Sequence, residues 1–151
     1  MIYEKTLYIL IGIQASGKST FAKQELSDCA YISLDRLHTR NNEWKALEKA
    51  FSRDLYCAID NTNSTVAERK KYIDFAKEND YKIVGFYFRS SVAECIDRNE
   101  KRTGKEHIPI KAILATAKRL EQPSYAEGFD ELYYVKIENN KFVVNEWNDS
   151  L

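Results

Sequence analysis

The feature that most constrains the fold is a short apolar run that leads directly into a glycine-rich turn. Residues 7–11, Leu-Tyr-Ile-Leu-Ile, are typical of a short buried strand, and residues 12–19, Gly-Ile-Gln-Ala-Ser-Gly-Lys-Ser, follow it. This turn fits the pattern G-x-x-x-x-G-K-[S/T], whose glycines let the backbone present N–H groups to an anion. Residues 20–26 can form a helix, whose N-terminus adds partial positive charge behind bound phosphates. Together, these features predict a phosphate-binding loop.

The loop predicts a role for each of its polar side chains. Lys18 would reach the β- and γ-phosphates of a nucleotide, and the Ser19 hydroxyl would ligate Mg²⁺. We therefore expect a nucleoside triphosphate, ATP, as a partner and Mg²⁺ as the metal. The residues expected to hold the nucleotide are Gly12, Gln14, Ala15, Ser16, Gly17, Lys18, Ser19 and Thr20. The alternative interpretation is a turn that only joins a strand to a helix.

Strand and helix patterns alternate along the rest of the chain. Further strands are predicted at residues 30–34, 55–59, 81–88 and 132–137, and residues 142–147 could pair beside the last of them. Helices are predicted to begin near Asn42, at the S/T-x-x-E capping boxes of Thr65 and Ser91, and at Pro109. The last helix is expected to bury Ile110, Ile113, Leu114 and Ala117. This alternation predicts an α/β fold with a parallel, five-stranded sheet flanked by helices.

Composition excludes several classes of protein. The 23 basic and 23 acidic residues balance, which argues against strong non-specific binding to nucleic acid. A local basic groove is still compatible with this composition. Residues 1–5 are not typical of a signal peptide, and the apolar run that follows is too short to span a membrane. Three isolated cysteines, at positions 29, 57 and 95, fit reduced thiols in a cytoplasmic protein. We expect a single domain over residues 1–151, with no membrane association and no obligate protein partner.

Polar residues follow two further strands at the edge where sheets of this kind bind ligands. Asp35 follows the second strand and is the candidate general base for phosphoryl transfer, or else a cap of the next helix. Asp60 follows the third strand, where phosphate-loop proteins place an acid that holds Mg²⁺, so the two acids could exchange roles. Asn61, Thr62 and Asn63 come next and could position the acceptor or a phosphate, or serve only as turn residues.

Two arginines predict a lid. Arg98 and Arg102 are four residues apart and share one face of a predicted helix, so an anion between them would be clamped by both. Residues 102–107, Arg-Thr-Gly-Lys-Glu-His, have the composition of a mobile flap that closes over a triphosphate and delivers arginine to the transition state. We therefore expect a lid at about residues 98–109. A solvated charged face, with Glu94 paired to Arg98, is the alternative.

With these residues in place, residues 7–135 resemble the kinase domain of the 5′-hydroxyl polynucleotide kinase family. The segments that carry the resemblance are residues 12–20, 31–35, 60–63, 98–104 with 108–109, and 123–130. The resemblance implies a single-domain P-loop NTPase and kinase fold with a helical lid. It also implies an ATP-dependent phosphotransferase in which Asp35 deprotonates a sugar 5′-hydroxyl, Lys18 and Ser19 act on the triphosphate and Mg²⁺, and Arg102 clamps the β- and γ-phosphates with Arg98 beside it.

The resemblance also implies an acceptor side. Thr62 would line it, with Asn63 next in the same segment. The family often has an arginine that contacts the acceptor's 3′-phosphate where this chain has His38, with Arg36 and Arg40 nearby. The aspartate of the family's Asp-Thr-Asn segment corresponds either to Asp60 or to the position of the asparagine that follows it.

Three functions stay open on the sequence. The first is an ATP-dependent kinase for the 5′-hydroxyl of a polynucleotide or nucleotide. The second is the same machinery acting on a small molecule, such as a nucleoside, a nucleotide sugar or an antibiotic, which the neutral charge and His38 favour. The third is a regulatory ATP-binding or ATPase module. No D-x-D-x-T phosphatase signature occurs, so we expect no phosphatase activity from this chain.

Overall fold

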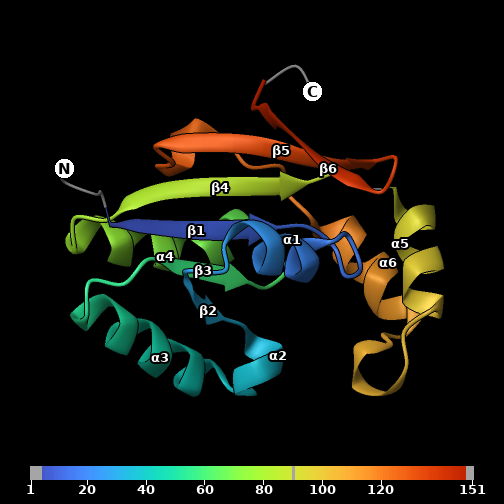
Figure 1. The fold of residues 1–151 in the computed structure, drawn as a ribbon, viewed down its shortest axis with the longest axis horizontal. Helices are drawn as coiled ribbons and strands as arrows, with labels where there is room; N and C mark the ends of the chain where they lie inside the picture. Colours follow the sequence, from blue (N-terminus) through green and yellow to red (C-terminus); the bar gives the residue numbers. More distant parts are fainter. Residues whose placement is uncertain (1–4, 90, 149–151) are drawn as a thin grey trace.

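The computed structural model describes residues 5–89 and 91–148, and it is built around a six-stranded sheet in the order β2-β3-β1-β4-β5-β6 (Figure 1). The strands are β1 Thr6–Ile11, β2 Ala30–Ile32, β3 Cys57–Asp60, β4 Lys82–Phe88, β5 Glu131–Glu138 and β6 Lys141–Glu146. The α-helices are α1 Lys18–Glu25, α2 Leu34–Leu37, α3 Arg40–Ser52, α4 Val66–Glu78, α5 Val92–Glu100 and α6 Ile110–Arg119. Two short 3₁₀ helices are η1 Gly104–Glu106 and η2 Tyr125–Glu127. The expectation for residues 1–4 lies outside the described residues.

The α/β class is confirmed, but the strand count is corrected. The first five strands are parallel, with β1 between β3 and β4. β6 turns back and pairs antiparallel with β5, so the sheet is mixed and has six strands instead of five. The turn between them consists of Asn139 and Asn140, with φ angles of 52° and 61°. Asparagine tolerates this left-handed conformation, which a tight two-residue hairpin requires.

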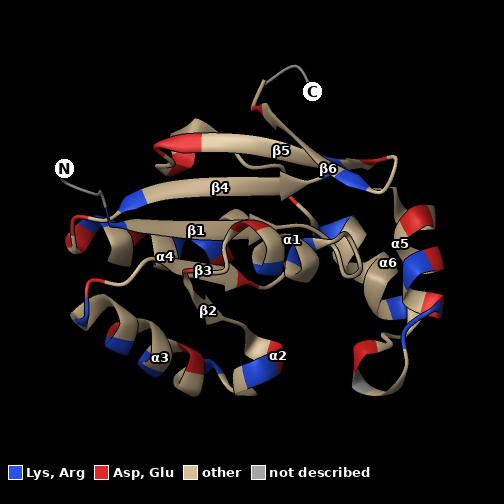
Figure 2. Ribbon diagram, in the orientation of Figure 1, with Lys and Arg blue, Asp and Glu red and all other residues tan. Residues whose placement is uncertain are grey.

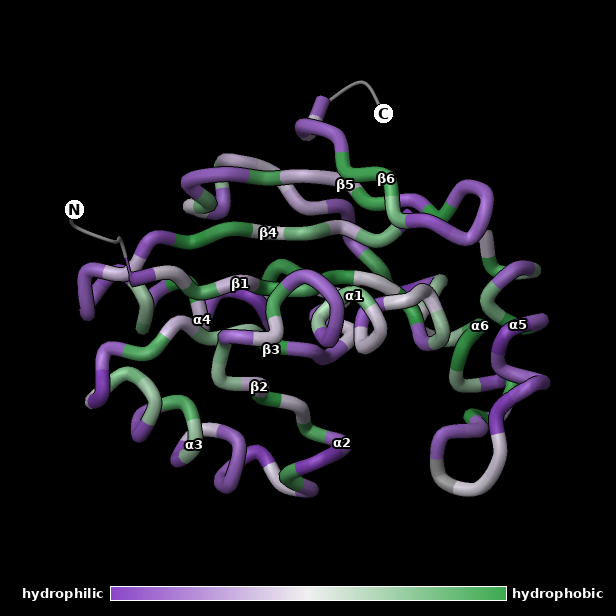
Figure 3. Tube along the Cα trace, in the orientation of Figure 1, coloured by the Kyte–Doolittle hydropathy of each residue, from purple (hydrophilic) through white to green (hydrophobic). Residues whose placement is uncertain are grey.

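Alternate residues of the central strand enter two different cores. Leu7, Ile9 and Ile11 pack on one face of the sheet in a cluster that includes buried residues of α3 and α4. Leu10 points to the opposite face and packs with Phe21 of α1. Figure 3 shows that hydrophobic residues run along β1 and β4, the strands at the centre of the sheet. Burial on both faces fixes this strand in the middle of the fold.

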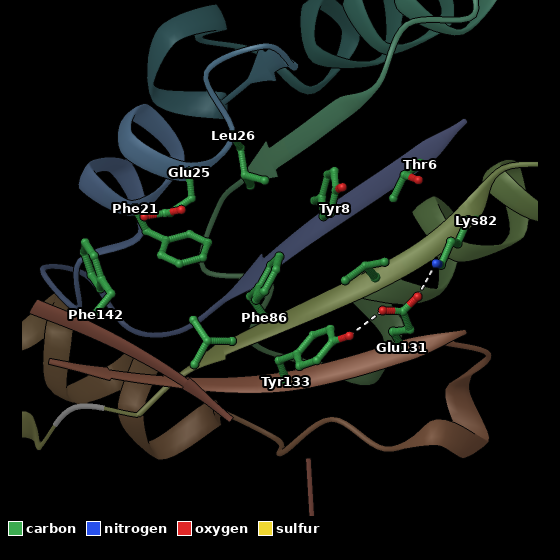
Figure 4. Close-up of a pocket in the computed structure, with 12 residues that line it drawn as sticks. Thr6, Tyr8, Phe21, Glu25, Leu26, Lys82, Phe86, Glu131, Tyr133 and Phe142 are labelled. Carbon is green, nitrogen blue, oxygen red and sulfur yellow. Dashed lines mark hydrogen bonds and ion pairs between the residues drawn. The ribbon is translucent and has the colours of Figure 1, made fainter. Parts of the chain in front are cut away.

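An open hollow of about 610 Å³ lies on the sheet face beside α1. Tyr8, Phe86 and Tyr133 stand in a row across β1, β4 and β5, with ring centroids 5.9 and 5.6 Å apart (Figure 4). Lys82 and Glu131 form an ion pair at its rim. The three rings pack against one another along the sheet and form one wall of the hollow.

Local differences from the predictions have simple causes. β2 ends at Ile32, because Ser33 is extended and the chain then enters the short helix α2, so Asp35 lies in a helix and not at a strand end. The cap of α3 is Thr39 and not Asn42, whose backbone N–H donates to the Thr39 hydroxyl.

The buried face of α6 also differs from the prediction. Ile110 and Leu114 are 43% and 49% exposed, which contradicts the prediction that they are buried. The predicted burial of Ile113 is confirmed, and Ile113 packs in one cluster with Cys95 of α5. Thr116 is buried as well, which was not predicted. No helix in the described part of the chain is long and apolar enough to cross a membrane.

Candidate active site

β1, β3 and α2 end at, or border, one cleft of about 380 Å³, at the end of the sheet where α5, α6 and η1 also lie (Figure 1). The residues that line it are Gln14, Ala15, Gly17, Lys18, Ser19, Thr20, Lys23, Asp35, Asp60, Asn61, Thr62, Arg102, Glu106 and Ile108. The structure therefore brings the phosphate loop, both acids, Thr62 and Arg102 together. It does not bring Arg98, His38 or Asn63 to this cleft.

Two glycines give the loop its shape. Gly17 has a φ of 103°, and a Cβ there would lie 3.1 Å from Ile137 Cδ1, so the turn into α1 requires glycine at this position. A Cβ on Gly12 would lie 2.8 Å from Ser16 Oγ. The Gly12 N–H donates to the carbonyl of Thr62 at 3.0 Å, which holds the loop against the end of β3. A glycine-rich loop at the start of a helix is the kind of turn that binds phosphate through its backbone N–H groups.

Lys18 is held inside the curve of the loop. Its Nζ donates to the carbonyls of Gly12 and Ile13 at 2.9 and 2.8 Å. Burial lowers the pKa of Lys18 to about 8, and nearby Asp60 opposes that shift. Among the described residues, the ammonium has neutral carbonyls and the Ser16 hydroxyl as its hydrogen-bond partners, so it lies where it can bind a phosphate.

Ser19, Asp60 and Tyr31 form a second cluster. The Ser19 hydroxyl donates to Asp60 Oδ2 at 2.7 Å, and the Tyr31 hydroxyl donates to the same oxygen. Burial and this hydrogen bond raise the pKa of Tyr31 to about 12, so its hydroxyl stays a donor. The sequence did not single out Tyr31, because no local pattern indicates that a tyrosine in one strand contacts an acid 29 residues further along the chain.

The donor set of this cluster fits Mg²⁺. Ser19 and Asp60 offer a hydroxyl and a carboxylate oxygen, which are hard ligands of the kind that Mg²⁺ prefers. In residues 5–89 and 91–148 no group of three or more His, Cys, Asp or Glu residues is placed to hold a metal. A site with few protein ligands suits Mg²⁺, which commonly keeps several waters and binds substrate phosphates.

The two candidate acids differ in burial and in hydrogen bonding. Asp60 is buried and accepts hydrogen bonds from Ser19 and Tyr31. Asp35 lies in the first turn of α2, is exposed, and borders the same cleft. Its carboxylate makes no hydrogen bond or ion pair with any residue that the structure describes. Asp35 is therefore the acid that is open to a substrate hydroxyl.

The two arginines do not face a common site. Arg102 borders the cleft and donates to the carbonyl of Glu106 at 3.3 Å. Arg98 donates to the carbonyl of Ala15 at 3.0 Å and pairs with Glu94 at 3.5 Å, the pairing that the alternative interpretation expected. Figure 2 shows that acidic and basic residues alternate along α5. Arg98 instead borders a second hollow of about 450 Å³, formed with the β5–β6 turn on the other side of the loop.

His38 and Asn63 lie outside the cleft. His38 is exposed and ends α2 with a φ of 70°. Its neighbour Arg36 lies over the ring of Tyr31 at 5.6 Å, in a third hollow of about 470 Å³ that adjoins the cleft at Ser19. Asn63 is buried and donates to the carbonyl of Leu10 at 2.7 Å, so it supports β1.

Comparison with known proteins supports the resemblance drawn from the sequence. The AAA domain family matches residues 41–123, which begin after the phosphate loop. The chain is 30% identical over 152 residues to the "Bifunctional polynucleotide phosphatase/kinase" of Schizosaccharomyces pombe, with 94% of this chain and 36% of that protein covered. It is 28% identical over 155 residues to the "Putative bifunctional polynucleotide phosphatase/kinase" of Acanthamoeba polyphaga mimivirus, with 95% and 36% covered. The chain thus spans about a third of the length of these relatives.

A solved structure shares the fold. Kti12 of Chaetomium thermophilum, crystallised with ADP-AlF3, matches with a TM-score of 0.67 at 19% identity, over 86% of this chain and 88% of that one. At this identity the likeness establishes the fold alone, which is that of the P-loop kinases.

Proposed function

This chain belongs to the AAA domain family, and from that premise we propose that it is an ATP-dependent kinase acting on the 5′-hydroxyl of a polynucleotide. The observation that carries the proposal is one cleft that is lined by the phosphate loop, the carboxylates of Asp35 and Asp60, and Arg102. Phosphoryl transfer needs a phosphate cradle, a group to accept the hydroxyl proton, and cations near the moving phosphoryl group. The names of the two relatives supply the acceptor class.

On the donor side, the loop amides and Lys18 would bind the triphosphate. The ammonium would exchange its two loop carbonyls for phosphate oxygens, which are stronger acceptors because they are charged. Ser19 and Asp60 would hold Mg²⁺, whose charge offsets that of the phosphates. Arg102 would add a second cation from the lid at residues 98–109.

On the acceptor side, Asp35 would take the proton of the attacking hydroxyl. It is better placed for this than Asp60, because Asp60 already accepts two hydrogen bonds and Asp35 is open to the cleft. A base must lie within hydrogen-bond reach of the proton that it removes. Asp35, in the first turn of α2, borders the cleft where the hydroxyl would bind.

The two adjoining hollows can separate donor from acceptor. In phosphoryl transfer, the attacking and leaving oxygens lie roughly in line on opposite sides of the phosphoryl group. The hollow beside Arg98 would take the nucleoside of ATP, and the hollow beside Arg36 would take the acceptor. Arg36 would then supply the cation that His38 does not.

A panel of acceptors tests the substrate class. The protein would be given ATP, Mg²⁺ and one acceptor at a time: 5′-hydroxyl DNA or RNA oligonucleotides, nucleoside 3′-monophosphates, nucleosides or sugars. The proposal predicts a kcat/KM for oligonucleotides at least tenfold above that for nucleosides and sugars. Phosphorylation of a small acceptor alone would establish a small-molecule kinase, and ATP hydrolysis without any phosphorylated acceptor would favour a regulatory ATPase.

A further inference from the structure

The helix that carries Asp35 cannot hold itself in place. α2 has only four residues, none of them buried, and its N-cap residue Ser33 makes no side-chain capping hydrogen bond. An isolated helix of one turn is unstable in water, because its first turn costs more conformational entropy than its hydrogen bonds return. The position of Asp35 therefore depends on contacts that other elements make with α2.

One such contact lies immediately before the acid. The backbone N–H of Leu34, the first residue of α2, donates to Asn61 Oδ1 at 2.8 Å. Asn61 follows the last residue of β3, so this bond ties the start of α2 to the sheet. Asp35 is the next residue along the helix, so fixing the backbone of Leu34 also fixes the direction in which the Asp35 side chain leaves the helix.

A buried carboxylate sets the orientation of the Asn61 amide. Glu43 of α3 is 1% exposed, and its Oε2 accepts from Asn61 Nδ2 at 2.8 Å. A carboxylate can only accept hydrogen bonds, so it selects the amide nitrogen and turns the amide oxygen toward Leu34. Arg40 and the Tyr72 hydroxyl donate to the same carboxylate, which compensates for its burial.

We propose that Asn61, oriented by Glu43, is a positioning residue for the general base Asp35. The chain of contacts runs from the Glu43 carboxylate through the Asn61 amide to the Leu34 N–H, and it directs the carboxylate of Asp35 into the cleft. This inference rests on the proposed function, because it takes Asp35 as the base. Sequence reasoning assigned Asn61 to the acceptor or a turn and did not single out Glu43.

Single variants of Glu43 and Asn61, and a double variant that exchanges their amide and carboxylate groups, test the positioning role. Glu43→Gln replaces an acceptor by an amide that can also donate, and Asn61→Ala removes the bond to Leu34. Each is expected to lower kcat for transfer to a 5′-hydroxyl oligonucleotide by about 10- to 100-fold, the usual cost of a misplaced catalytic group, with the Kd for ATP unchanged. The double variant Glu43→Gln with Asn61→Asp restores an acceptor for Leu34 and is expected to recover kcat to within about threefold of wild type.

A matched control uses the other side of the same carboxylate. Tyr72→Phe removes one donor to Glu43 and a 3.5 Å contact of the Asn61 amide nitrogen, but leaves the shorter bonds that join Glu43, Asn61 and Leu34. Its kcat is expected to stay within about threefold of wild type. Hydrogen exchange of the Leu34 amide gives a readout that does not depend on catalysis: protection should fall in Glu43→Gln and Asn61→Ala, and persist in Tyr72→Phe and in the double variant.

The background of Asp35→Asn separates the positioning role of Asn61 from the role of Asp35 as the base. If Asn61 acts through Asp35, Asn61→Ala causes no further loss when Asp35→Asn is already present. The same fold-loss in both backgrounds, unchanged Leu34 protection, or no recovery in the folded double variant would overturn the positioning role. Full transfer by Asp35→Asn itself would overturn the proposed base instead, whatever the Leu34 amide shows.

Discussion

Lys18 is the residue on which nucleotide binding depends most directly. Burial lowers the pKa of its ammonium, and its partners in the structure are carbonyls and a hydroxyl of its own loop. A phosphate would give this buried ammonium charged partners, and hydrogen bonds to charged groups are the stronger kind.

Lys18→Met is therefore expected to weaken ATP binding by about 10- to 100-fold while the protein stays folded. Isothermal titration calorimetry measures the affinity, and circular dichroism checks the fold. An unchanged Kd for ATP would show that the loop does not hold the triphosphate through this ammonium.

Arg36 and His38 differ in their position relative to the cleft, so they can be compared as acceptor-binding residues. Arg36 borders a hollow next to the cleft, whereas His38 is exposed and outside it. We expect Arg36→Ala to raise the KM for a 5′-hydroxyl oligonucleotide about tenfold and to reduce its salt dependence, because a phosphate contact is lost. His38→Ala is the matched control and should change KM less than twofold. The reverse ranking would place the acceptor on the His38 side.

At the scale of elements, a buried asparagine closes the base of the lid. Asn99 at the end of α5 donates through Nδ2 to the carbonyl of Ile108 at 2.6 Å, and its Oδ1 accepts from the Ile108 N–H at 2.8 Å. Its side chain thus links the two ends of the segment that contains Arg102 and η1. The rest of this segment is mostly exposed, so its position depends strongly on this pair of bonds.

Asn99→Ala leaves the N–H and carbonyl of Ile108 without this partner, and we expect a loss of about 1–3 kcal/mol in the free energy of unfolding. Transfer should slow as well, because Arg102 loses its fixed position. Urea unfolding and hydrogen exchange across residues 100–108 measure the two effects. A stable variant with unchanged exchange would mean that other contacts hold the lid.

Signals that are local in sequence predicted elements well. The hydroxyls of Thr65 and Ser91 accept from the backbone of Glu68 and Glu94, so both proposed helix starts are confirmed. Apolar periodicity predicted less well. It extended the second strand into the residues of α2, and on α6 it was right for Ile113 but wrong for Ile110 and Leu114, because periodicity does not show which neighbouring elements cover a helix. The cleft followed from strand ends, but Tyr31 and Glu43 required tertiary contacts that no spacing reveals.

At the scale of the whole molecule, a buried ion pair joins distant parts of the chain. Arg69 of α4 is fully buried and binds both carboxylate oxygens of Glu127, at 2.8 and 3.2 Å. Arg69 also donates to the carbonyl of Asn63 at 2.8 Å, and Glu127 accepts from the Ser124 N–H. This pair connects α4, η2 and the segment that follows β3, next to the cleft.

Removing one partner of such a pair leaves a buried charge uncompensated. Glu127→Gln is expected to lower the free energy of unfolding by about 3–5 kcal/mol. The exposed pair Lys70–Asp74 is the control, and Asp74→Asn should cost less than about 1 kcal/mol. Urea unfolding compares the two. Equal, small losses would show that the buried pair does not hold these parts of the fold together.

The central claim is that this cleft transfers phosphate with Asp35 as the base. The most direct test incubates wild type and Asp35→Asn with γ-³²P-ATP, Mg²⁺ and a 5′-hydroxyl oligonucleotide, and measures ATP affinity in parallel. We predict label at the 5′ end with wild type, and a loss of about 10²- to 10⁴-fold in rate with Asp35→Asn at unchanged ATP affinity. Label that persists in Asp35→Asn, or that never reaches the oligonucleotide, would contradict the account.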